Sequence, residues 1–265
     1  MSQDWTEQMI AETDGGIGWM IFNNPARHNA VSFEMWEAMP RIIERFVADP
    51  EVRVIVLKGA GERAFVAGAD ISQFEKKRGT ADAIKVYNAA TMEAYQRLEE
   101  AGKPTIAMVN GYCIGGGLAI AVGCDLRIAA EGSTFGIPAA KLGLGYDYGG
   151  VRKLVNLVGP SFTKEIFYTA RTFNTDEALT MGLINRVQPW ERLEAYVREY
   201  AQVISGNAPL TIRAVKTSVR EALKDPEKRD MATVHEQIEA CLSSSDYQEG
   251  RRAFMEKRPP RFQGR

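Results

Sequence analysis

Two nearly continuous apolar segments, separated by a long amphipathic one, constrain the fold of this chain more than any other feature. Residues 52–61 (VRVIVLKGAG) and 104–111 (PTIAMVNG) have the composition of strands that are buried on both faces. Residues 80–102 between them have the periodicity of an amphipathic helix. Because strands that alternate with helices favour crossover connections, we expect an α/β fold with a largely parallel sheet.

The rest of the N-terminal part supports the same pattern. Residues 16–25 predict a strand that ends in a turn, and residues 126–136 predict a strand followed by a turn. Ser32 has the position of an N-cap for a helix whose apolar face extends to Phe46. Pro40 lies inside this helix and is expected to kink it.

The strand signal fades after Gly150. Short helices are predicted there, with one strand-like segment at 183–189, and the chain beyond Trp190 is predicted to be almost wholly helical. We therefore expect a core domain over residues 1–190 and a helical region over residues 191–265.

The composition excludes several classes of protein. A net charge of -1 over 265 residues argues against a general binder of nucleic acid or of anionic membranes. Three cysteines without paired spacing predict free thiols, with Cys113 and Cys124 buried, and two histidines leave little material for a metal site. The N-terminal residues have no basic leader or apolar run. The expectation is a cytoplasmic protein without a bound metal.

The segment 110–125 (NGYCIGGGLAIAVGCD) contains three consecutive glycines before an apolar, helix-like run. Glycines at the start of a helix let backbone N–H groups approach a phosphate or a developing oxyanion. The spacing fits neither a P-loop nor a dinucleotide motif, which disfavours a phosphate. A second glycine turn, AFVAGAD (64–70), could supply another N–H at the same edge of a parallel sheet. Both turns could equally serve tight packing of helix on strand, and the sequence leaves these two alternatives open.

Four segments resemble the crotonase superfamily, the enoyl-CoA hydratase/isomerase group, in order and along nearly the whole chain. They are NNPARHNA (23–30), FVAGADI (65–71), the segment 110–138 and ALTMGLINRV (178–187). The resemblance implies a spiral of ββα units in residues 1–190 and a trimerisation region in residues 191–265. The expected assembly is a homotrimer or a dimer of trimers. It also implies a coenzyme A thioester as substrate, so that no separate cofactor is expected.

By this resemblance, the thioester carbonyl would lie between the backbone N–H groups of Ala69 and Gly116. Asp125 would be a structural hydrogen-bonding residue. The positions that would contact coenzyme A are Arg27, Ala67, Asp70, Ile71 and Lys257, of which Asp70 is also a candidate helix N-cap.

The chain departs from the family pattern where hydratases carry two glutamates. Ala119 and Ala139 occupy those positions. Neither side chain can transfer a proton, so the two-glutamate mechanism of hydration is not expected.

The following segment, KLGLGYDYGG (141–150), contains the candidate catalytic residues Tyr146 and Asp147. Tyr146 resembles a tyrosine of methylmalonyl-CoA decarboxylases. Asp147 partly resembles, one residue out of register, an aspartate of dihydroxynaphthoyl-CoA synthases and ketocyclohexane-carboxyl-CoA hydrolases. Alternatively, Tyr146 packs and Asp147 caps the next helix.

We expect a lyase that acts on an acyl-CoA through an enolate, with decarboxylation or C–C cleavage favoured. The alternatives are a non-catalytic acyl-CoA-binding protein and a true hydratase that uses substitute residues.

Overall fold

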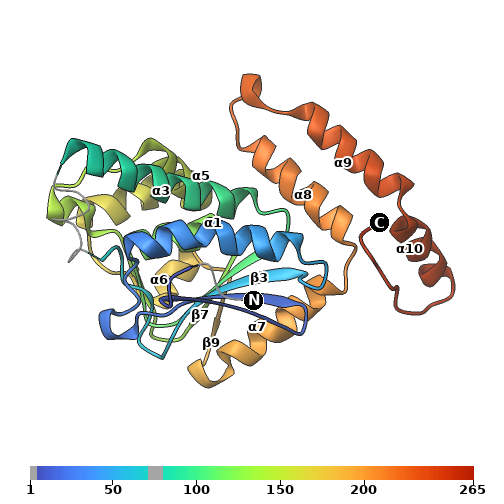
Figure 1. The fold of residues 1–265 in the computed structure, drawn as a ribbon, viewed down its shortest axis with the longest axis horizontal. Helices are drawn as coiled ribbons and strands as arrows, with labels where there is room; N and C mark the ends of the chain where they lie inside the picture. Colours follow the sequence, from blue (N-terminus) through green and yellow to red (C-terminus); the bar gives the residue numbers. More distant parts are fainter. Residues whose placement is uncertain (1–4, 71–79) are drawn as a thin grey trace.

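The strands of the chain form two sheets in a computed structural model, which describes residues 5–70 and 80–265 (Figure 1). The larger sheet has the order β1-β2-β3-β5-β7-β9 and the smaller one the order β4-β6-β8. The strands of the larger sheet are β1 (Met9–Asp14), β2 (Ile17–Phe22), β3 (Val54–Gly59), β5 (Thr105–Val109), β7 (Leu126–Ala130) and β9 (Arg186–Gln188). Those of the smaller sheet are β4 (Ala64–Val66), β6 (Tyr112–Ile114) and β8 (Thr134–Gly136).

Successive strands alternate between the two sheets. Strands β3, β5 and β7 belong to the larger sheet, and each is followed along the chain by a strand of the smaller sheet. All pairs except β1 with β2 are parallel. This alternation is a spiral of ββα type and confirms the predicted α/β fold with a parallel sheet.

Both faces of the larger sheet are buried, which explains the continuous apolar strands. Ile55 and Leu57 pack into the core under α1 and α3, whereas Val54 and Val56 pack into a second core under α7 (Figure 1). The helices of this part are α1 (Phe33–Ala48), α3 (Ala81–Glu100), α4 (Gly116–Gly123), α5 (Tyr148–Thr169), α6 (Thr175–Thr180) and α7 (Trp190–Ser205), with short 3-10 turns η1 (Pro25–Arg27) and η3 (Pro138–Leu142).

In two of the predicted helices, particular residues determine where the helix begins or breaks. Ser32 caps α1 by accepting a hydrogen bond from the Met35 N–H at 3.3 Å, and α1 is a single helix that contains Pro40. Helix α5 is broken at Gly159, which has a positive φ of 77° directly before Pro160. The prediction of short helices after Gly150 is therefore confirmed at that break.

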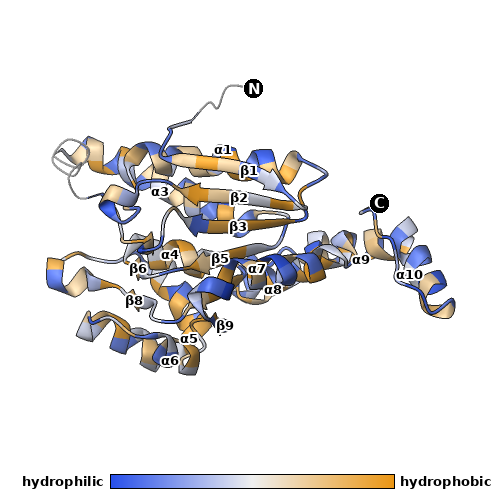
Figure 2. Cartoon of the chain, turned by 90° about the horizontal axis from the view of Figure 1, so that it is seen from below, coloured by the Kyte–Doolittle hydropathy of each residue, from blue (hydrophilic) through white to orange (hydrophobic). Residues whose placement is uncertain are grey.

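Three helices extend away from the sheets at the C-terminal end (Figures 1 and 2). They are α8 (Pro209–Ala222), α9 (Met231–Ser243) and α10 (Ser245–Met255), with a 3-10 turn η4 (Pro226–Lys228) after α8. Lys216 anchors α8 through an ion pair with Asp125 at 2.8 Å, and Asp125 also accepts hydrogen bonds from Thr105. The expected structural role of Asp125 is confirmed. Among the described residues, no helix is both long and apolar enough to cross a membrane.

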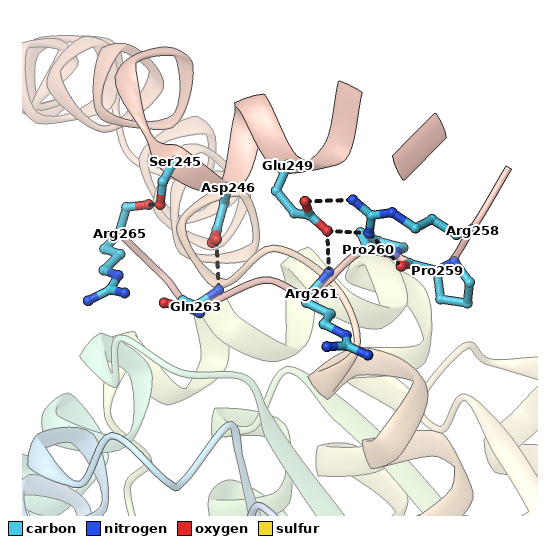
Figure 3. A pocket seen from close by; sticks show the side chains of 9 residues that line it. All are labelled: Ser245, Asp246, Glu249, Arg258, Pro259, Pro260, Arg261, Gln263 and Arg265. Atoms are coloured by element: carbon cyan, nitrogen blue, oxygen red, sulfur yellow. Dashed lines mark hydrogen bonds and ion pairs between the residues drawn. The ribbon is translucent and has the colours of Figure 1, made fainter. Parts of the chain in front are cut away.

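The C-terminal tail folds back on α10, and the two border an open hollow of about 920 Å³ (Figure 3). Glu249 pairs with Arg258 at 2.7 Å, and Asp246 accepts the N–H groups of Gln263 and Gly264 at 2.7 Å. The guanidinium of Arg258 lowers the pKa of Glu249 to about 2. These contacts hold the tail against α10.

Candidate active site

The two glycine turns singled out in the sequence lie side by side. A side chain on Gly116 would place its Cβ only 3.8 Å from the backbone nitrogen of Ala69. One turn follows β4 and the other precedes α4, and β4 pairs with β6 in the smaller sheet. The parallel strands therefore bring Ala69 and Gly116 to one edge, as the sequence predicted.

The N–H groups of these two residues form no hydrogen bond within the described part of the chain. The bridge between Val31 and Ala69 is made by the flanking groups, from the Val31 N–H to Gly68 O and from the Asp70 N–H to Val31 O, both at 2.9 Å. Gly116 is the first residue of α4, where a backbone N–H has no partner inside the helix. Two donors that face a shared space can stabilise a developing oxyanion.

The glycines of the triplet differ in what their positions require. Gly115 has a positive φ of 56°, which residues with a Cβ rarely adopt. A Cβ on Gly117 would lie 2.1 Å from Val66 O, so Gly117 allows α4 to pack directly on β4. The packing explanation therefore accounts for Gly117, whereas a Cβ on Gly116 would lie at ordinary contact distance from its neighbours.

A buried arginine holds the other end of α4. Arg127 donates hydrogen bonds to Cys124 O at 2.6 Å, to Ala121 O at 3.1 Å and to Leu183 O at 2.8 Å. Burial lowers the pKa of its guanidinium. Arg127 is not among the residues predicted for the site, although an arginine inside the apolar segment LRIAA is a signal that the sequence contains.

The residues expected to contact coenzyme A are brought together only in part. Arg27 forms an ion pair with Asp70 at 2.9 Å, and the Ala67 N–H donates to His28 O at 3.0 Å. These contacts join the turn at 25–28 to the turn at 67–70. Ile71, and the helix that Asp70 was expected to cap, lie outside the described residues. Lys257 is exposed just beyond α10, at the far end of the molecule from α4 (Figure 2).

Tyr146 and Asp147 have different surroundings although they are neighbours in the sequence. The Asp147 carboxylate caps α5 by accepting the Gly150 N–H at 3.1 Å, as one of the sequence alternatives predicted. The Tyr146 ring packs edge-on against Phe167, with 4.8 Å between the ring centroids. Burial, aided by the charge of Asp147, raises the pKa of Tyr146 to about 12. No group of the described residues forms a hydrogen bond with the Tyr146 hydroxyl.

The remaining site positions contain no group for acid–base chemistry. Ala119 lies on α4, three residues after Gly116, and Ala139 is buried in η3. Cys113 and Cys124 are buried free thiols, as predicted. Within residues 5–70 and 80–265, no cluster of three His, Cys, Asp or Glu side chains is placed to hold a metal ion.

The spiral of paired sheets defines the class of protein, because solved structures of the crotonase fold match it over nearly the whole chain. An enoyl-CoA hydratase/carnithine racemase from Magnetospirillum magneticum aligns with a TM-score of 0.91 and 32% identity over 98% of this chain and 97% of that one. The sequence model of the enoyl-CoA hydratase/isomerase family matches residues 12–265, and the chain belongs to this family.

Two relatives are similar over almost their full lengths. A short-chain-enoyl-CoA hydratase of Clostridium acetobutylicum is 35% identical over 94% of this chain and 95% of the relative. A carnitinyl-CoA dehydratase of Proteus mirabilis is 34% identical over 98% of this chain and 100% of the relative.

Proposed function

We propose that this chain stabilises the enolate of an acyl-CoA thioester between the N–H groups of Ala69 and Gly116. The observation that carries the proposal is that Ala69 and Gly116, the first residue of α4, lie close together, and that neither N–H has a hydrogen-bond partner among the described residues. The helix dipole adds partial positive charge at this point. Such a donor contributes about 3 to 4 kcal/mol to transition-state stabilisation in acyl-transfer enzymes.

The reaction favoured for this site is decarboxylation or another C–C cleavage. In a decarboxylation, the C–C bond to the carboxylate breaks and CO2 leaves. The electron pair of that bond stays on the acyl group and forms the enolate. The enolate then takes a proton at carbon. This sequence of steps needs no base, which suits a site with alanine at positions 119 and 139.

Tyr146 is the proposed proton donor and carboxylate-orienting group. Because its pKa is about 12, the phenol keeps its proton at neutral pH and acts as a hydrogen-bond donor rather than as a base. Hydrolysis or retro-Claisen cleavage would require a base, for which Asp147 is the candidate. Its cap on α5 already uses one carboxylate oxygen, so this second reaction class is less well supported.

Hydration by substitute residues is the main alternative, because the relatives named above are a hydratase and a dehydratase. The second alternative is a non-catalytic acyl-CoA-binding protein. Alanine at positions 119 and 139 favours this alternative, whereas the Tyr146 hydroxyl, which could serve as a proton donor, counts against it.

The proposed contacts to coenzyme A are those of Arg27, Ala67, Asp70 and Ile71 in one subunit. Lys257 would reach the same ligand from a neighbouring copy in a homotrimer or a dimer of trimers. Exposed apolar side chains on the C-terminal helices, including Val219, Leu242, Phe254 and Met255, support such an assembly.

The test is turnover on a panel of crotonyl-CoA, methylmalonyl-CoA and a cyclic β-ketoacyl-CoA, followed by mass spectrometry. We expect loss of CO2 or ring opening, reduced at least tenfold in Tyr146→Phe. The variant Tyr148→Phe is the matched control, because this neighbouring tyrosine is exposed. Rapid hydration of crotonyl-CoA would contradict the proposed reaction, and binding without turnover of any ester would favour the non-catalytic alternative.

A further inference from the structure

A tryptophan borders the space between the two proposed oxyanion donors. The Gly116 Cβ position that lies 3.8 Å from Ala69 N is also 3.5 Å from Cζ2 and 3.8 Å from Cη2 of Trp36. Trp36 belongs to α1, far in sequence from both glycine turns. The edge of its indole therefore forms one boundary of the space that a thioester carbonyl would occupy.

The indole is fixed in place by other aromatic side chains. Its Nε1–H donates to the Tyr87 hydroxyl at 3.0 Å, and the Tyr95 ring packs on it edge-on with 5.3 Å between centroids. The Phe33 ring lies 6.0 Å from that of Tyr87. We refer to Phe33, Trp36, Tyr87 and Tyr95 as the aromatic wall. It joins α1 to α3, and Trp36 and Tyr87 are only 1% and 2% exposed.

The burial of Trp36 identifies which part of a thioester faces the aromatic wall. The carbonyl carbon has two substituents, the sulfur of coenzyme A and the acyl chain. Coenzyme A is too large to be enclosed and must lead to solvent, and the side chain of Arg27, paired with Asp70, is half exposed. The substituent beside the buried indole is therefore the acyl chain.

We infer that the aromatic wall ends the acyl site and restricts this protein to short acyl groups, with Trp36 as the residue that sets the limit. Non-bonded carbon atoms approach no closer than about 3.5 Å, so a chain directed at the wall cannot extend past the indole. A longer chain would have to displace an indole held by a hydrogen bond and by ring packing. This inference rests on the proposed binding of an acyl-CoA.

The test measures binding of acetyl-, butyryl-, octanoyl- and dodecanoyl-CoA by calorimetry. These saturated esters can neither be hydrated nor lose CO2, so their affinities report the shape of the site and not the reaction. Wild type is expected to bind butyryl-CoA at least tenfold more tightly than octanoyl-CoA. In Trp36→Leu this ratio is expected to fall to about threefold or less.

Trp19→Leu is the matched control. Trp19 is 2% exposed and is the same size as Trp36. It lies in β2, however, within the core under α7 on the other face of the sheet. This variant should keep the wild-type ratio. Trp36→Phe, a smaller change, provides a second variant and should give an intermediate ratio.

Two outcomes would overturn the inference. The first is that wild type binds octanoyl-CoA as tightly as butyryl-CoA, a result that can be observed without any variant. The other is Trp36→Leu and Trp36→Phe with unchanged ratios. If wild type binds none of the four esters, the acyl-CoA proposal itself fails.

Discussion

At the scale of single residues, the glycine triplet shows what a sequence can and cannot predict about a site. The triplet and the AGAD turn indicated two turns at one edge of the sheet, and these turns do lie side by side. The requirement for glycine follows from a positive φ at Gly115 and from the closeness of Val66 O at Gly117. Trp36 at the same site was not predicted, because nothing in α1 indicates that its indole reaches a turn 80 residues away.

Removal of the Gly116 donor tests the proposed oxyanion role directly. Proline is tolerated at the first position of a helix, where its missing N–H has no partner inside the helix. Gly116→Pro should therefore retain the helical content seen by circular dichroism. Turnover of whichever thioester wild type converts should fall about 100- to 1000-fold, as when an oxyanion donor is lost elsewhere.

Met231→Pro is the matched control, because Met231 is the exposed first residue of α9. It should retain wild-type turnover. Near-normal turnover in a folded Gly116→Pro protein would refute the role of this N–H.

At the scale of elements, the strands buried on both faces were predictable and the strands of the smaller sheet were not. Strands β3 and β5 fill two cores with alternate residues, so that nearly every position is apolar. Strands β4, β6 and β8 have three residues each, too few for a periodicity to develop. Strand β1 was also missed, because its C-terminal half is exposed and polar.

Helix α4 is the element on which the site depends, because its first residue is Gly116 and its C-terminal end is held by Arg127. Arg127→Met would leave the buried carbonyl oxygens of Cys124 and Leu183 without their donor, whereas Ala121 O would keep the Cys124 N–H. An unpaired buried polar group costs about 1 to 3 kcal/mol, so we expect a loss of about 2 kcal/mol or more in the free energy of unfolding. Urea denaturation measures this loss.

Arg186→Met serves as the comparison for Arg127→Met. Arg186 lies on the adjacent strand β9 and is exposed, and among the described residues its side chain donates only to the carbonyl of Asn185. Its removal should change stability by no more than about 0.5 kcal/mol. Equal stability of the two variants would mean that Arg127 does not hold α4.

At the scale of the whole molecule, the C-terminal helices are attached to the sheets at few points. Lys216 joins α8 to Asp125, and Arg53 donates to the Phe262 carbonyl in the tail at 3.0 Å. Helix α7 lies beyond the expected boundary at residue 190, yet it packs on the sheet, so the helices that extend outward are α8 to α10. The sequence predicted these helices, but a single chain could not indicate what their apolar faces contact.

The proposed homotrimer accounts for the exposure of those faces. Phe254 is 86% exposed in the single chain, and a neighbouring copy would remove this apolar surface from water. A charge placed there would be buried without a partner on assembly. Phe254→Glu should therefore shift the mass measured by light scattering from three or six chains toward one.

Val203→Glu controls for the added charge, because Val203 is 71% exposed on α7 and away from the C-terminal helices. Its mass should match that of wild type.

The same samples test whether Lys257 reaches the ligand of a neighbouring copy, since a lysine supplied by a neighbour is lost with the assembly. Affinity for coenzyme A should then fall in Phe254→Glu and in Lys257→Ala to a similar extent. Wild type with the mass of one chain would refute the assembly, and Phe254→Glu with unaltered mass would place the interface elsewhere. If Lys257→Ala remains a trimer and binds coenzyme A as tightly as wild type, Lys257 does not contribute to the site.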